Sequence, residues 1–267
     1  MKTRIISGAI MIAVLVAVLV TGAYFPIVIT AALAILCIVA DYEILYNAAG
    51  IKSKAAITGA AVYSALAVFA IAGYTGKYVS FTAVTVIYCV YSAVMALYNH
   101  KDFSVKEITA LIGMPVIISY AFSCLEGILN HNSGIYYLLL MLNCSSICDM
   151  GAYFVGVTCG KHKLCPEISP KKTVEGAIGG IVSSVIVALI LIFAFDMTSK
   201  LAVTLILTVP FCILGMVGDL FASAIKRGAG IKDYGKLIPG HGGVLDRVDS
   251  ILMIAPVLYL LIGYGVI

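Results

Sequence analysis

Long apolar stretches follow one another along almost the whole chain, with short polar turns between them. A helix that crosses a membrane needs about 20 mostly apolar residues, and nine stretches approach this requirement. They cover residues 5–22, 27–46, 55–73, 79–98, 108–129, 134–157, 174–195, 201–222 and 250–267. The pattern predicts an all-α, polytopic integral membrane protein with about nine transmembrane helices, or eight if the first two stretches form one broken hairpin.

The basic residues indicate how these helices are oriented, because cytoplasmic loops carry an excess of Lys and Arg. With nine spans and a cytoplasmic N-terminus, 15 of the 17 Lys and Arg residues fall on the cytoplasmic side, and Lys77 and Lys200 fall outside. Fusing the first two spans would move Lys2 and Arg4 outside, so the nine-span arrangement is favoured. We expect a multi-pass protein of the cell's inner (plasma) membrane, with two long loops, 158–173 and 223–249, in the cytoplasm.

The composition agrees with a membrane protein. Hydrophobic residues make up 62% and charged residues 11% of the chain, whereas soluble domains have about 25% charged residues. The net charge of +4 is too small to indicate nucleic acid, and the eight cysteines lie mostly in apolar runs, which is typical of packing residues. We expect one continuous membrane domain, with N-terminal helices over 1–133 and a catalytic region over 134–267.

Four polar residues near the end of the eighth span are spaced to share one helix face. Asp219, Ser223, Lys226 and Arg227 stand at i, i+4, i+7 and i+8, which helical periodicity places on one side. A carboxylate followed by a hydroxyl and two cations can hold a metal ion and then a phosphate. The structural alternative is an Asp–Lys pair at a helix end.

A second polar group stands at the start of the last span. Asp246 and Asp249 are three residues apart and share a helix face, where the helix dipole alone would favour carboxylates. A glycine-rich turn precedes them, and such turns can direct backbone N–H groups at an anion. The turn contains Gly240, His241, Gly242 and Gly243, with Lys232 before it and Arg247 after it.

A third group surrounds the first long loop. Asp149 lies about 8 residues, or roughly 12 Å, from the inner end of its span, and a carboxylate at that depth is a functional hypothesis by default; the alternative is a pair with a Tyr or Ser nearby. Near the end of the loop, Ser169 and Pro170 suggest an N-cap followed by the first helical residue. Lys171 and Lys172 then suit a lipid phosphate or a triphosphate, although the excess of cytoplasmic cations also explains them.

The other acidic residues in the spans suggest no chemistry. Asp41 and Glu43 end the second span, and Glu126 lies near the outer face, where we expect it to be solvated.

The segment 223–249 resembles the signature of the phosphatidate cytidylyltransferase family, the CDP-diacylglycerol synthases. It reads Ser223-Ala224-Ile225-Lys226-Arg227-x4-Lys232-Asp233-x-Gly235-x3-Pro239-Gly240-His241-Gly242-Gly243-x2-Asp246-Arg247-x-Asp249. Two upstream segments are also similar to that family, Asp149-x2-Ala152-Tyr153-x2-Gly156-x3-Gly160-Lys161 and Ser169-Pro170-Lys171-Lys172-Thr173-x-Glu175-Gly176. The specific resemblance covers 149–249, and the length is closer to bacterial members than to eukaryotic ones.

The resemblance implies transfer of the cytidylyl group of CTP to phosphatidate in phospholipid synthesis, giving CDP-diacylglycerol and pyrophosphate, with Mg²⁺ and, as an open alternative, a second cation. It implies Asp219 and Asp246 as chief metal ligands, helped by Asp249 and Asp149. It also implies that cations and a histidine hold the phosphates, namely Lys171, Lys172, Lys226, Arg227, His241 and Arg247. Membrane lipids are expected around the chain, nucleic acid is not, and a homodimer is left open.

Two other functions remain alternatives. A CTP-dependent kinase of lipid alcohols would share the apolar body and the acidic, glycine-rich site. An ion-coupled transporter could use Asp149 and Asp219 as ion sites, but its signature would be paired broken helices in repeated halves, which this chain lacks in sequence.

Overall fold

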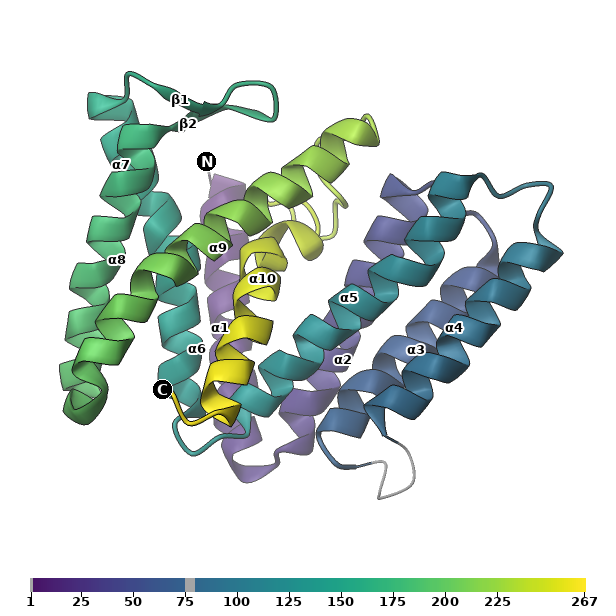
Figure 1. Cartoon of the computed structure of the whole chain (residues 1–267), viewed down its shortest axis with the longest axis horizontal. Helices are drawn as coiled ribbons and strands as arrows, with labels where there is room; N and C mark the ends of the chain where they lie inside the picture. Colours follow the sequence, from purple (N-terminus) through teal and green to yellow (C-terminus); the bar gives the residue numbers. More distant parts are fainter. Residues whose placement is uncertain (1, 75–79) are drawn as a thin grey trace. The chain divides into compact units, whose positions relative to one another are not determined.

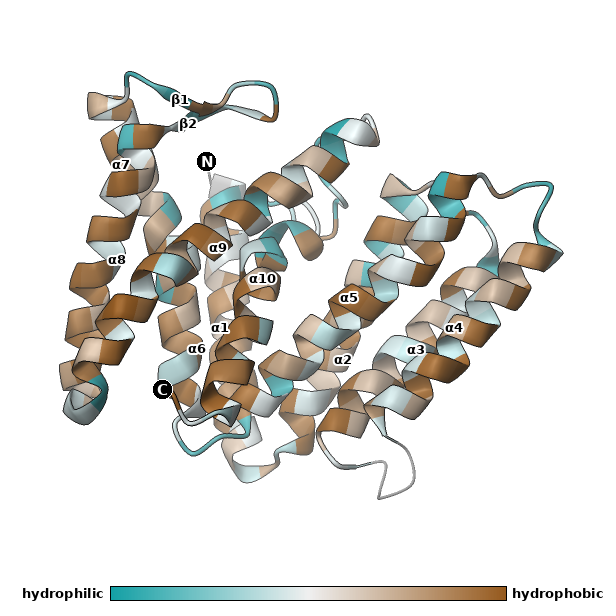
Figure 2. Ribbon diagram, in the orientation of Figure 1, coloured by the Kyte–Doolittle hydropathy of each residue, from teal (hydrophilic) through white to brown (hydrophobic). Residues whose placement is uncertain are grey.

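A computed structural model describes residues 2–74 and 80–267, and these residues form an all-α protein. Eight helices within these ranges are long and apolar enough to cross a membrane. Hydrophobic residues cover most of the helix bodies, and hydrophilic residues gather in many of the connections (Figure 2). The prediction of a multi-pass membrane protein is therefore confirmed.

The eight helices are the first eight of the predicted spans. The first two are separate helices, α1 (Lys2–Tyr24) and α2 (Ile27–Tyr42), so they do not form one broken span. The ninth predicted span is α10 (Leu245–Gly263), which has 19 residues and carries Asp246, Arg247 and Asp249 near its start. These three charges distinguish α10 from the eight. Residue 79, the predicted start of the fourth span, and Lys77 lie outside the described residues.

Contacts between residues divide the chain into two compact units. The first contains Met1–Asn130 and Gly228–Val248, and the second contains His131–Arg227 and Asp249–Ile267. The predicted division at residues 133 and 134 stays a prediction.

The first unit is a bundle of helices (Figure 1), and these helices are mostly apolar. After α1 and α2, the chain forms a π-helical turn η1 (Glu43–Ala48), then α3 (Lys54–Ile71), α4 (Phe81–Tyr98) and α5 (Val105–Leu129). Helix α3 packs against α2, α4 and α5. Serines cap three of these helices, at Ser53, Ser80 and Ser104, because their hydroxyls accept otherwise unpaired N–H groups.

Polar side chains are buried inside this bundle. Ser64 donates a hydrogen bond to Asp41, and Ser119 donates to Ser64 at 3.1 Å. Glu126 is fully buried and accepts hydrogen bonds from Thr30 and Asn130. The expectation that Glu126 is solvated is therefore wrong, because the α2 hydroxyl and the amide beyond α5 enclose its carboxylate.

The second unit consists of helices and one small β-hairpin (Figure 1). Helix α6 (Gly134–Leu142) continues through the π-helical turn η2 (Asn143–Ile147) into α7 (Cys148–Cys159). The hairpin strands β1 (Lys163–Cys165) and β2 (Ser169–Thr173) are antiparallel and lead into α8 (Val174–Ala194). A short 3-10 turn η3 (Thr198–Lys200), α9 (Leu201–Gly228) and most of α10 follow.

The hairpin corrects one local prediction. Ser169 and Pro170 belong to β2, so they are not the cap and first residue of a helix. Thr173 caps α8 instead, and its hydroxyl accepts the N–H of Gly176 at 3.1 Å. The Ser169-Pro170 pair led to a wrong prediction of a helix start, because proline also suits the extended backbone that precedes a helix.

Glycines bring α7 and α8 into close contact. A Cβ added at Gly176 would lie 2.6 Å from the carbonyl oxygen of Ala152, and one at Gly156 would lie 2.9 Å from Thr173 Oγ1. Small residues allow such close backbone approach between helices in membranes. These two glycines of the upstream motif thus position the hairpin relative to α7.

Candidate functional site

The first unit contains a cavity of about 620 Å³ that we call the basic pocket. Four of its lining residues are cationic, and one, Asp233, is acidic. The cationic lining residues are Arg4, Lys232, Lys236 and Arg247, and His241 also lines the cavity. This concentration of positive charge suits an anion with several negative charges.

The glycine-rich turn forms one wall of the basic pocket. Gly240 and Gly242 have φ angles of 78° and 90°, which side chains with a Cβ rarely adopt. The N–H of Gly242 donates to the carbonyl oxygen of Ile238 at 3.1 Å, and that of Gly243 donates to Asp246 Oδ2 at 3.0 Å. Because these N–H groups are used within the protein, the turn shapes the pocket, and side chains supply the positive charge.

His241 is held by the first helix. Ser7 Oγ lies 2.8 Å from His241 Nδ1 and also donates to the carbonyl oxygen of Thr3 at 2.9 Å. With the hydroxyl proton given to Thr3, Nδ1–H donates to Ser7, and Nε2 remains for other contacts. Ser7 therefore fixes the orientation of a ring in the basic pocket.

Two carboxylates hold the turn and the start of α10. Asp246 Oδ2 accepts the N–H of Tyr234 at 2.8 Å as well as that of Gly243. Glu43, in the η1 turn, accepts the N–H groups of Val244 and Leu245 at 3.0 and 2.9 Å. The dismissal of Glu43 as a mere helix-end residue is wrong, since its carboxylate is buried against the signature segment.

The second unit contains a smaller cavity, about 250 Å³, that we call the carboxylate pocket. Lys172 Nζ lies 2.5 Å from Asp219 Oδ2 and 3.9 Å from Asp149 Oδ1. Lys171, Ser169 and Tyr153 also line this cavity. Two acidic residues predicted from separate motifs are thus brought to one cationic atom.

The predicted stripe after Asp219 is helical. Helix α9 continues to Gly228, so Ser223, Lys226 and Arg227 lie on the same helix as Asp219. The ion pair of Asp219 with Lys172 joins α9 to β2, which differs from the Asp–Lys pair within one helix that we considered. A Cβ added at Gly218 would lie 2.9 Å from the carbonyl oxygen of Asp249, so the glycine allows the backbones of α9 and α10 to approach closely.

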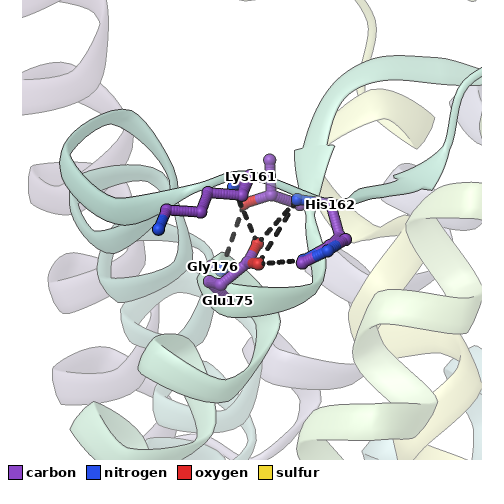
Figure 3. Close-up of polar contacts among 5 residues, drawn as sticks. Lys161, His162, Glu175 and Gly176 are labelled. Carbon is purple, nitrogen blue, oxygen red and sulfur yellow. Dashed lines mark hydrogen bonds and ion pairs between the residues drawn. The ribbon is translucent and has the colours of Figure 1, made fainter.

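Glu175 anchors the hairpin that carries Lys171 and Lys172. Its carboxylate accepts the N–H groups of Lys161 and His162, each at 3.1 Å, and lies 2.6 Å from His162 Nδ1 (Figure 3). The N–H of Val174 donates to the carbonyl oxygen of His162 at 2.9 Å. The chain entering β1 is therefore fastened to the start of α8.

The predicted metal ligands belong to different units. Asp219 and Asp249 are in the second unit, where Asp249 Oδ1 accepts the N–H of Ser250 at 2.8 Å, and Asp246 is in the first. Within the described residues 2–74 and 80–267, no three His, Cys, Asp or Glu side chains form a group able to hold a metal ion. The set of three aspartates stays a prediction.

Comparison with known proteins identifies the family. The chain matches the sequence model described as "Cytidylyltransferase family" over residues 2–264. The chain belongs to the cytidylyltransferase family. Together with the names of the relatives given next, this match confirms the resemblance to phosphatidate cytidylyltransferases that was inferred from the segment 223–249.

Curated relatives of this cytidylyltransferase family member include proteins from staphylococci. Proteins named phosphatidate cytidylyltransferase are 43% identical in Staphylococcus haemolyticus (strain JCSC1435), 44% in Staphylococcus saprophyticus subsp. saprophyticus and 42% in Staphylococcus aureus (strain COL). Each alignment covers 131 residues, which is 49% of this chain and 50% of the relative. The chain thus spans about half the length of these relatives.

Sequence reasoning missed four residues that shape the basic pocket, Arg4, Ser7, Glu43 and Asn47. Glu43 carried a signal, because an ionisable residue in an apolar span is a functional hypothesis by default. Arg4 had a sufficient explanation as a cytoplasmic charge, and nothing in the sequence linked it to a loop more than 200 residues away.

Proposed function

We propose that the chain transfers the cytidylyl group of CTP to phosphatidate. An oxygen of the phosphatidate phosphate attacks the α-phosphorus of CTP, the bond to the β-phosphate oxygen breaks, and pyrophosphate leaves. The products are CDP-diacylglycerol and pyrophosphate. The observation that carries the proposal is the basic pocket, whose cationic lining comes largely from the segment that resembles the family signature.

The charge of the basic pocket matches the triphosphate of CTP. Both substrates are polyanions, so their repulsion must be offset before they can react. Transfer of this kind depends mostly on positioning and electrostatic stabilisation. Lys232, Arg247 and Arg4 supply cations at the pocket, and the guanidinium groups of the two arginines suit bidentate contact with phosphate.

The carboxylate pocket suits a divalent cation, and Mg²⁺ is the one we propose. Asp149 and Asp219 already face one cationic atom, Lys172 Nζ, and carboxylate oxygens are the ligands that Mg²⁺ prefers. Asp246 and Asp249, expected from the sequence to bind metal, are also proposed as Mg²⁺ ligands. When bound, the ion would neutralise phosphate charge and stabilise the leaving group.

Four further cations complete the proposed phosphate contacts. Lys171 and Lys172 line the carboxylate pocket, while Lys226 and Arg227 end α9. Ser223 and the turn around Gly242 and Gly243 complete the proposed substrate-binding set.

The lipid-alcohol kinase and the ion-coupled transporter are less well supported. A kinase would transfer the γ-phosphate and leave no cytidine on the lipid, and a transporter would need no pocket for a polyanion. A first test is to incubate purified protein with CTP and phosphatidate and to look for CDP-diacylglycerol by chromatography. The product must require both substrates.

Replacing Arg4 with glutamine is expected to raise the KM for CTP about tenfold, which corresponds to roughly 1.4 kcal/mol. Loss of the guanidinium removes a charge-assisted contact with phosphate, whereas the glutamine keeps a polar side chain. Steady-state rates at varied CTP measure the effect. Lys52→Gln is the control, because Lys52 is exposed in the same unit and does not line the pocket. Equal KM values in Arg4→Gln and the wild type would remove Arg4 from the binding site.

We also propose that the active site faces the cytoplasm of the cell, where CTP is available. Single cysteines at Lys52, Lys101 and Lys236 in a cysteine-free chain should be protected from an impermeant thiol reagent in intact cells. A cysteine at Lys200 should react. Labelling at position 236 from outside would reverse the proposed orientation.

A further inference from the structure

The π-helical turn η1, at the end of α2, contacts the signature segment at both ends of its glycine-rich part. Glu43 and Asn47 are four residues apart in this turn. Glu43 binds Val244 and Leu245, and the Asn47 side-chain amide donates to the carbonyl oxygen of Tyr234 at 2.6 Å. π-Helical turns occur often at functional sites because they redirect side chains.

The Glu43 carboxylate caps the start of α10 by accepting hydrogen bonds from backbone N–H groups. Each of its oxygens accepts one backbone N–H, at 3.0 Å from Val244 and 2.9 Å from Leu245. The first N–H groups of a helix lack partners within the helix, and a negative charge there is favoured by the helix dipole. Glu43 is only 3% exposed, so loss of this contact would leave buried donors unsatisfied.

Two glycines make room for the Glu43 carboxylate. A Cβ added at Gly235 or at Gly243 would overlap the carboxylate atoms. These positions therefore need glycine for space, whereas Gly240 and Gly242 need it for their positive φ angles. The Glu43 carboxylate therefore packs closely against the backbone at Gly235 and Gly243.

The Asn47 contact holds the other end of the segment. Tyr234 is 1% exposed, its carbonyl oxygen accepts from Asn47, and its N–H donates to Asp246. Lys236 and His241 lie between the two anchored points and line the basic pocket. The η1 turn thus fixes the backbone from which these two groups reach the pocket.

We propose that Glu43 and Asn47 are positioning residues that hold the segment 234–245 in its binding conformation. They act by placing Lys236 and His241 at the basic pocket. The expected effect on the KM for CTP rests on the proposed function. Asp41, two residues before Glu43, is equally buried but bonds to Ser64 in α3. It is therefore a matched control for the loss of a buried carboxylate near the junction of α2 and η1.

Limited proteolysis tests the anchoring without any enzyme activity. In Glu43→Gln, the new amide NH₂ group would face the N–H of Val244 or of Leu245, so two donors would oppose each other. In Asn47→Asp, a carboxylate oxygen would face the carbonyl oxygen of Tyr234, so two acceptors would oppose each other. In the full chain in detergent micelles, trypsin should cut after Lys232 or Lys236 about tenfold faster in each variant, because local opening becomes more populated. Fragments are identified by mass spectrometry. Trypsin should cut the Asp41→Asn variant at the wild-type rate.

The outcomes separate cleanly. The proposal would be overturned if trypsin cut both variants at the wild-type rate. It would also be overturned if Asp41→Asn accelerated cleavage as much as Glu43→Gln and Asn47→Asp do. Acceleration in one variant alone would remove the other residue from the anchor.

A kinetic split provides the second readout. If the segment binds the triphosphate, Glu43→Gln should raise the KM for CTP about tenfold and change the KM for phosphatidate less than about twofold, a difference of roughly 1 kcal/mol. A rise for phosphatidate alone would assign the pocket to the lipid phosphate and overturn the role in CTP binding. If the wild type makes no CDP-diacylglycerol, the proposed function fails, whereas the proteolysis comparison still tests the anchor.

Discussion

Asp219→Asn is expected to reduce cytidylyl transfer by about a thousandfold, the upper range for loss of one electrostatic contact in an active site. The substitution keeps the shape of the side chain and removes its charge. In the structure this charge pairs with Lys172 Nζ at 2.5 Å. Its loss would remove a ligand of the proposed Mg²⁺ ion and the closer of the two carboxylates that face Lys172.

The test measures transfer rates over a range of Mg²⁺ concentrations, together with binding of Mn²⁺ to the purified protein by electron paramagnetic resonance. Asp196→Asn is the matched control, because Asp196 is exposed in the same unit and has a φ of 54°, which asparagine tolerates. Rates and Mn²⁺ binding near wild type in Asp219→Asn would exclude Asp219 from the ligand set.

Asp246→Asn is expected to reduce transfer by a similar factor, about a hundredfold to a thousandfold, with little loss of folded protein. The N–H groups of Tyr234 and Gly243 both bind one oxygen, Oδ2. The carbonyl oxygen of asparagine can take this place and accept both, so the glycine-rich turn keeps its anchor. The loss of rate then reports the missing negative charge.

Asp246→Ala separates anchoring from charge. It removes both hydrogen bonds and should lower thermal stability and accelerate tryptic cleavage after Lys236, whereas Asp246→Asn should do neither. If Asp246→Asn transfers at the wild-type rate, the charge of Asp246 is dispensable, and its role is to hold the turn.

The sequence predicted the helices well because lipid imposes a simple rule. A span must be long, apolar and internally hydrogen-bonded, so α1 to α5 and the helices of the second unit could be located by hydropathy alone. The hairpin β1–β2 was missed because its strands are short and lie between two helices. Its Ser169-Pro170 pair has the residue types of a helix start.

Sequence reasoning identified residues that line the two pockets, but it missed residues that hold the pocket backbone in place. Asp149 and Asp219 come from separate motifs, and the structure brings both to Lys172. Glu43 was set aside because a carboxylate at a helix end has an ordinary explanation. Its actual partners, Val244 and Leu245, lie about 200 residues away, and no periodicity in the sequence links them.

The most direct measurement of the central claim uses CTP labelled separately at the α- and γ-phosphates, with purified protein and phosphatidate. We predict that the α-label enters the lipid fraction as CDP-diacylglycerol and that the γ-label is released as pyrophosphate. Label from the γ-phosphate in the lipid, with the α-label left in soluble CDP, would contradict the account and indicate a lipid kinase.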